Sequence, residues 1–166
     1  SKITKTLKQN PFIKDVQIKK NFKFQITINV TEEKVVAYNL TNQSYLLSNG
    51  TYINDKNFLG VPQLNNYTPE DVLKNFAEEL GKLDEDIIAD ISEIEYSPSK
   101  NETGETIDST RFKLKMKDGN TVYINVKKCN VLSYYNQIYA SLKDKKGVLN
   151  LDSGNYERYV LTLYEE

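Results

Sequence analysis

Histidine and tryptophan are absent from this 166-residue sequence, and Cys129 is its one cysteine. Without histidine the chain lacks the usual general base near neutral pH and the commonest metal ligand of proteins. A single cysteine excludes an internal disulfide and any multi-cysteine metal site. These absences argue against most hydrolase mechanisms, and they indicate neither a metal nor any other cofactor.

Long apolar runs and glycine-rich segments are also missing. No stretch approaches the roughly 18 to 20 apolar residues that a membrane-spanning helix needs, and no basic-then-apolar leader marks a signal peptide. The seven glycines are scattered and form no phosphate-binding loop, which argues against nucleotide binding. Because the sequence opens at Ser1 rather than at Met, we interpret it as part of a longer chain, and any targeting element or membrane anchor would then lie outside the sequence.

The charged residues are unevenly distributed along the chain. Ser1 to Tyr38 carries 8 basic and 3 acidic residues, Thr68 to Thr110 carries 3 basic and 13 acidic, and Arg111 to Cys129 carries 6 basic and 1 acidic. The sign of the charge therefore alternates in blocks, although the net charge is only -1. Such blocks form no single broad basic surface, so we do not expect nucleic-acid binding.

The first 42 residues predict a small helix–strand–strand unit. Ile3 and Leu7 have helical spacing, and Asn10-Pro11 ends the helix because proline disfavours helical geometry in the residue before it. Apolar and polar residues alternate over 16–18 and 24–30 around a turn at 20–21, the pattern of two paired strands. The stretch 40–44 is polar and lacks periodicity, so we place a domain boundary there, between 1–42 and 43–166.

The second unit is predicted to be a larger mixed β-sheet domain with two helices packed on it, which makes the fold class α+β. Strand pairs flank the turns at Asn49-Gly50 and Asp118-Gly119, and another strand covers 91–96. One helix begins at Pro69 and ends at Gly81, and a second covers 131–142. The polar segment 97–109 predicts a long solvated loop, whereas 148–151 and 156–164 predict closing strands.

Carboxylates are the catalytic candidates that the composition leaves. The Asp84-Glu85-Asp86 cluster lacks the glycine and the spacing of a calcium loop. Asp90, Glu93 and Glu95 alternate on a predicted strand, where carboxylates usually face water or lysines of a neighbouring strand. We therefore predict a solvated acidic surface and a protein that is not an enzyme.

The last predicted strand carries apolar residues on both faces, a row of Tyr159, Leu161 and Leu163 and a second row of Tyr156, Val160 and Tyr164. A central strand with both faces covered has this pattern. An edge strand that accepts a strand from a partner protein has it as well. The pattern alone does not choose between the two.

The order of these elements and several short motifs resemble the extracytoplasmic region of the FtsQ/DivIB family of bacterial cell-division proteins. The motif Asn10–Val16, with a strand ending near Glu33 and then Val35-Val36-Ala37, is similar to the later part of that family's POTRA domain. Phe12 stands where the family often has tryptophan, and Lys23 where it often has proline. The opening POTRA elements are missing, so the first unit resembles a remnant of that domain.

The rest of the chain is similar to the β domain of the same family. Ile91–Ile94, the Asp118-Gly119 turn, a tyrosine-rich helix and Asp152-Ser153-Gly154 before the final strand follow each other in the family's order. The resemblance implies a non-catalytic scaffold that binds FtsB/DivIC-type and FtsL-type division proteins and helps to regulate septal cell-wall synthesis. It also implies a single-pass protein of the bacterial cell membrane, with this region extracellular and membrane contact only through an upstream helix.

In the family, the last strand of the β domain pairs with a strand of the FtsB-type partner, which favours the edge interpretation above. By position, Gly154 would permit close backbone approach and Tyr159 would act as an aromatic anchor. The implied partner-binding residues are Asp152, Ser153, Gly154, Tyr156, Arg158, Tyr159, Val160 and Leu161.

Two other functions stay open at this point. The chain is also compatible with a POTRA-type chaperone or transport module that presents strand edges to diverse polypeptides. An enzyme acting on cell-wall glycan would need a pocket with two carboxylates, one of them with a raised pKa. Residues 84–90 would be the place to find that pocket.

Overall fold

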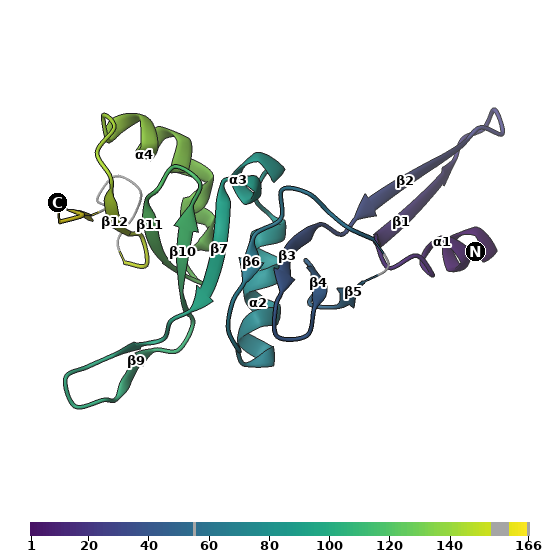
Figure 1. Ribbon diagram of the computed structural model, residues 1–166. Coiled ribbons are helices and arrows are strands. Elements are labelled where there is room, and N and C mark those ends of the chain that lie inside the picture. The colour runs from purple at the N-terminus through teal and green to yellow at the C-terminus, as the bar shows by residue number, and fades with distance from the viewer. Residues whose placement is uncertain (55, 154–159, 166) are drawn as a thin grey trace. The chain divides into compact units, whose positions relative to one another are not determined.

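The computed structural model describes residues 1–54, 56–153 and 160–165, and the chain divides into two compact units, Ser1–Lys34 and Val35–Glu166 (Figure 1). The division lies earlier than the boundary expected at 42. Strand β3 (Val35–Asn39) belongs to the second unit because it pairs with β4 (Ser44–Leu47) and β6 (Gln63–Leu64). Neither pairing can be inferred from the composition of the segment.

The first unit contains the helix and the two strands that the sequence predicts. Helix α1 (Lys2–Leu7) is capped by Ser1, whose Oγ accepts a hydrogen bond from the Thr4 N–H at 3.2 Å. Strands β1 (Ile13–Lys20) and β2 (Ile26–Glu32) form an antiparallel hairpin. Every residue of β2 is exposed, so the described part of this unit has little apolar core of its own.

The second unit is built on a mixed sheet. Among the described residues nine strands join in the order β13-β12-β11-β10-β7-β6-β3-β4-β5. The pairs β3–β6, β6–β7 and β11–β12 are parallel and the other pairs are antiparallel. The bounds of the strands not yet given are β5 Tyr52–Ile53, β7 Ile91–Tyr96, β10 Arg111–Met116, β11 Thr121–Asn125, β12 Gly147–Asn150 and β13 Val160–Leu163.

The two predicted hairpin turns are confirmed. Asn49-Gly50 joins β4 to β5, and Asp118-Gly119 joins β10 to β11. Gly50 has a φ of 83° and Gly119 a φ of 96°, a left-handed conformation that glycine adopts without steric cost.

Helices cover the apolar face of this sheet. They are α2 (Glu70–Gly81), α3 (Glu85–Ala89), a 3₁₀ helix η1 (Cys129–Tyr134) and α4 (Tyr135–Ser141). The helix predicted over 131–142 is therefore a 3₁₀ segment followed by an α-helix. In the centre of the core Phe76 of α2 stacks on Phe112 of β10, with ring centroids 3.8 Å apart. Both rings are buried, so α2 is fixed to the middle of the sheet.

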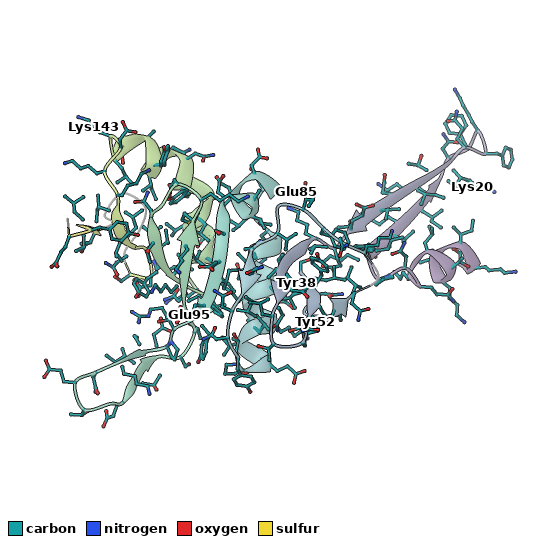
Figure 2. The ribbon with its side chains drawn as sticks, in the orientation of Figure 1. Lys20, Tyr38, Tyr52, Glu85, Glu95 and Lys143 are labelled. Atoms are coloured by element: carbon teal, nitrogen blue, oxygen red, sulfur yellow. The ribbon has the colours of Figure 1, made fainter. Side chains whose placement is uncertain are left out.

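The opposite face of the sheet is polar, as the alternation in β7 and β10 predicts. Glu93 of β7 lies directly across from Lys115 of β10, and their charged groups approach to 3.0 Å. Glu95 lies on the same strand, and Figure 2 labels its side chain. These carboxylates thus face solvent and basic neighbours.

The segment 97–109 departs from the expected loop. Strands β8 (Ser99–Lys100) and β9 (Thr106–Asp108) pair as a separate hairpin that projects from the sheet (Figure 1). Asn101 organises its turn, because its Oδ1 accepts hydrogen bonds from the N–H groups of Thr103 and Glu105. A polar sequence can form a hairpin when side chains stabilise the turn in this way, which the composition of the segment concealed.

Candidate partner-binding edge

Strand β13 lies at one end of the described sheet. It pairs antiparallel with β12, from Gly147↔Leu163 to Asn150↔Val160, and no described strand lies on its other side. Of the two interpretations that the sequence left open for the last strand, the structure therefore selects an edge strand for residues 160–163.

The direction of the backbone groups on β13 follows from one hydrogen bond at its end. The Tyr164 N–H donates to the Lys146 carbonyl at 3.2 Å. In an antiparallel ladder, hydrogen-bonded pairs alternate with pairs that are not hydrogen-bonded. The backbone of Thr162 therefore faces β12, whereas the N–H and C=O groups of Leu161 and Leu163 point to the open edge. A second strand could pair with these outward groups.

The side chains of β13 are unequally covered. Leu161 lies opposite the fully buried Leu149 and packs against the core. Val160 is 60% exposed and Leu163 is 53% exposed. The strand thus has one anchored residue and two apolar side chains available to a partner.

Gly147 allows β13 to lie close against β12. Across the pair from Leu163, a Cβ atom at position 147 would come within 2.8 Å of the Leu163 Cα and closer still to the Thr162 carbonyl oxygen. Because these are backbone atoms, a side chain at 147 would force the strands apart. Sequence analysis missed this residue, which immediately precedes the strand predicted over 148–151, although a glycine next to a strand is itself a signal of close backbone approach.

Tyr164 fastens the end of β13 to the turn between β10 and β11. Its hydroxyl donates to the Gly119 carbonyl at 2.9 Å and lies 2.7 Å from the Thr121 hydroxyl. These hydrogen bonds connect the end of β13 to the β10–β11 turn and to β11, past the intervening strand β12. The edge strand is therefore held by its side chain as well as by its backbone.

A buried polar network supports the same end of β12. Asn120 is only 1% exposed. Its side chain accepts a hydrogen bond from the Gly147 N–H at 3.0 Å. Its amide also approaches the Tyr135 hydroxyl, which in turn donates to Asp118. Burial, followed by the bond to Asp118, raises the pKa of Tyr135 above its usual value, so this hydroxyl stays protonated as a donor. The network joins the β10–β11 turn to α4 and β12.

The predicted site residues are only partly within the described structure. Asp152 and Ser153 follow β12, and the Asp152 carbonyl accepts a hydrogen bond from the Asn125 side chain at 3.0 Å. Val160 and Leu161 lie on β13 as expected from the sequence. Gly154, Tyr156, Arg158 and Tyr159 lie outside the described residues.

The sequence matches a family model. Residues 35–158 match the model described as "Cell division protein FtsQ/DivIB, C-terminal". The matched range covers most of the chain, begins with the first strand of the second structural unit and ends at residue 158, before β13. The chain belongs to the FtsQ/DivIB family.

Individual FtsQ/DivIB relatives extend the match into the first unit. Cell division protein DivIB of Listeria monocytogenes is 32% identical in an alignment 158 residues long that covers 90% of this chain and 56% of the relative. DivIB of Brevibacillus brevis is also 32% identical over 158 residues, and DivIB of Bacillus subtilis is 30% identical over 162 residues. The chain thus spans somewhat more than half the length of these curated relatives.

A solved structure has a related fold. It is the major extracytoplasmic domain of the cell division protein DivIB from Geobacillus stearothermophilus, described as a trans isomer, with a TM-score of 0.53 and 24% sequence identity. The likeness covers 68% of this chain and 96% of the other. It supports the α+β fold. No helix among the described residues is long and apolar enough to cross a membrane.

FtsQ/DivIB membership also bears on the enzymatic alternative, since the family is one of non-catalytic division proteins. The chain does contain two carboxylates beside one cavity, Asp90 and Asp118, and burial followed by the Asp118 charge raises the pKa of Asp90. Asp118, however, already accepts hydrogen bonds from Tyr135 and from the Asn120 N–H. These contacts give it a structural role in the turn.

The acidic cluster Asp84-Glu85-Asp86 is exposed at the start of α3, as predicted for a solvated surface. Among the described residues, no group of three or more Cys, Asp or Glu side chains could hold a metal ion.

Proposed function

We propose that this chain is a non-catalytic scaffold of the bacterial division machinery that binds an FtsB/DivIC-type partner by strand addition to β13. An FtsL-type protein would join the same assembly. The residues proposed to contact the partner are Asp152, Ser153, Gly154, Tyr156, Arg158, Tyr159, Val160 and Leu161. The observation that carries the proposal is the edge of β13 along which no described strand lies, with outward backbone groups at Leu161 and Leu163.

Strand addition suits this edge for two physical reasons. A partner strand would satisfy the outward N–H and C=O groups of Leu161 and Leu163, which gives affinity without demanding a particular partner sequence. Burial of the exposed Val160 and Leu163 side chains would add apolar contact area, worth about 1.5 to 3 kcal/mol for each side chain that becomes fully buried. Leaving this apolar edge open would instead favour self-association.

The first unit and the location of the protein belong to the same proposal. We assign residues 1–34 to the later part of a POTRA-like domain, on the basis of the motif Asn10–Val16 and the β1–β2 hairpin. The region is proposed to be extracellular and attached to the cell membrane through a helix upstream of this sequence.

The test is calorimetric titration with the extracellular segment of the same organism's FtsB/DivIC-type protein. Truncation after Asp152 removes β13 and is expected to abolish binding while the remaining fold persists. A finer comparison uses Leu163→Pro, which removes an outward N–H, and Leu163→Ala, which keeps that N–H and shortens the side chain. Strand addition predicts that the proline variant binds about tenfold more weakly than the alanine variant.

Thr162→Pro is the matched control for these variants. Its N–H faces β12, so proline there detaches β13 itself and should reproduce the truncation. Equal binding by Leu163→Pro and Leu163→Ala would contradict strand addition and point to side-chain contact alone. Equal affinity for sequence-scrambled peptides would instead favour the POTRA-type chaperone function.

A further inference from the structure

The turn between β1 and β2 exposes three large apolar side chains at its tip. Phe22 is 87% exposed, Phe24 is 80% exposed and Ile26, the first residue of β2, is 57% exposed. Each phenylalanine side chain could bury well over about 100 Å² in a contact. Two exposed rings within three residues therefore leave a large apolar area in water, which is unfavourable unless another surface covers it. The exposed cluster therefore indicates a contact surface.

The tip is an ordered turn that holds these rings outward. The Oδ1 atom of Asn21 accepts hydrogen bonds from the N–H groups of Lys23 at 2.9 Å and Gln25 at 3.0 Å, while its amide donates to the Gln25 side chain at 2.7 Å. Phe24 has a φ of 59°, a left-handed conformation that a bulky residue adopts only when its surroundings impose it. The turn thus stabilises a strained backbone that presents an aromatic ring to solvent.

The charge around the tip has a single sign. Residues 17–28 contain Lys19, Lys20 and Lys23 and no acidic residue. The Lys20 Nζ lies 5.3 Å from the centroid of the Phe24 ring, and the Lys23 Nζ lies 5.8 Å from that of Phe22. Figure 2 labels Lys20 at the hairpin tip. The ammonium groups of Lys20 and Lys23 therefore share one small surface with the two rings, and Lys19 precedes Lys20 on β1.

We propose that this tip, formed by Phe22, Phe24, Lys19, Lys20 and Lys23, docks on the surface of an anionic phospholipid bilayer. Aromatic rings partition into the boundary between headgroups and acyl chains, while lysines at the same depth approach the lipid phosphates. Charge complementarity favours an anionic bilayer over an apolar protein groove. A groove would cover the rings but would also remove three ammonium groups from water without supplying negative charge. The proposal rests on the first unit alone and does not depend on strand addition at β13.

The contact is expected to be weak and reversible. Near an anionic surface each lysine strengthens binding about fivefold. Each phenylalanine that leaves water adds about tenfold to a hundredfold when its ring is fully buried. A tip of this kind orients a protein at the membrane and does not anchor it irreversibly.

The absence of tryptophan makes the chain suitable for a direct test. In the variant Phe22→Trp the single indole reports the polarity of the tip by fluorescence. Titration with phosphatidylglycerol vesicles is expected to shift its emission to shorter wavelength, and brominated acyl chains are expected to quench it. Salt at about 0.5 M should reverse the shift, because the Debye length then falls below 5 Å. Leu59→Trp, at a 98% exposed site in the second unit, is the control that should not respond.

Variants separate the two parts of the surface in this assay. Lys19→Ser, Lys20→Ser and Lys23→Ser together should weaken binding about a hundredfold, whereas Lys100→Ser with Lys127→Ser, at exposed positions elsewhere, should change it little. The proposal is overturned if millimolar anionic lipid produces no shift. An equal shift with zwitterionic vesicles, or a shift without quenching by brominated chains, would overturn it as well, since both charge and insertion are required.

Discussion

Gly147 and the Thr162 carbonyl oxygen lie so close across the β12–β13 pair that a Cβ atom on Gly147 would sit 2.1 Å from that oxygen. Real Cβ atoms essentially never approach another heavy atom to less than 3.0 Å. The neighbour is backbone, so no rotation of a side chain can relieve the clash. Docking of the edge strand therefore depends on glycine at this position.

The substitution Gly147→Ala is expected to displace β13 from β12. Overpacking against backbone costs about 1 to 3 kcal/mol of the free energy of unfolding. Hydrogen exchange should show the effect as lost protection of amides that pair with β12, above all those of Thr162 and Tyr164. Gly104→Ala, at the exposed tip of the β8–β9 hairpin, strains its own left-handed backbone (φ 85°), but no atom lies within 4 Å of the new methyl group, so the amides of β13 should keep their protection.

The substitution Tyr164→Phe tests the second attachment of β13. It removes the hydroxyl that bonds Gly119 and Thr121, and it should cost about 1 kcal/mol, concentrated in local opening of the edge strand. Hydrogen exchange at 160–164 should accelerate while exchange in the core strand β10 stays unchanged. Tyr67→Phe, at a 73% exposed site, is the matched control; equal acceleration in both variants would contradict an anchoring role.

The substitution Asn120→Ala should destabilise the second unit more strongly. It leaves the buried Gly147 N–H without its acceptor, which costs about 1 to 3 kcal/mol. Urea unfolding should show a lower midpoint at unchanged slope. Asn130→Ala, at an exposed position, should leave the midpoint in place. An unchanged midpoint in Asn120→Ala would mean that the network contributes little.

The free energy of unfolding should fall as pH rises above about 9, because burial raises the pKa of the Cys129 thiol from 9.0 to about 12. Between these values the folded chain binds the proton that the unfolded chain has lost, so stability is complete below pH 9 and decreases toward pH 12. The full slope is about 1.4 kcal/mol per pH unit.

Chemical denaturation of the parent chain and of Cys129→Ala at a series of pH values measures this slope. The variant should show a flatter profile between about pH 9 and 10, below the range where Tyr135, whose pKa is also raised, begins to contribute. The same slope in both proteins would contradict the assignment to Cys129.

Local features of this protein followed from its sequence. The turns at Asn49-Gly50 and Asp118-Gly119, the helix that ends at Gly81 and the alternation in β10 each depend on neighbouring residues along the chain. The lack of histidine likewise limited the available chemistry before any fold was known. Motif order was sufficient to indicate the FtsQ/DivIB family, which the family model then confirmed.

Other features required the tertiary structure, because they depend on contacts between segments far apart in the sequence. Apolar residues on both faces of the last strand suited a central or an edge position, and only the pairing order of the described strands placed β13 at the edge. The importance of Gly147 depends on the Thr162 backbone, and that of Asn120 depends on Gly147, 27 positions away. Periodicity determines which face of an element is apolar, whereas the partner of that face is decided by long-range packing.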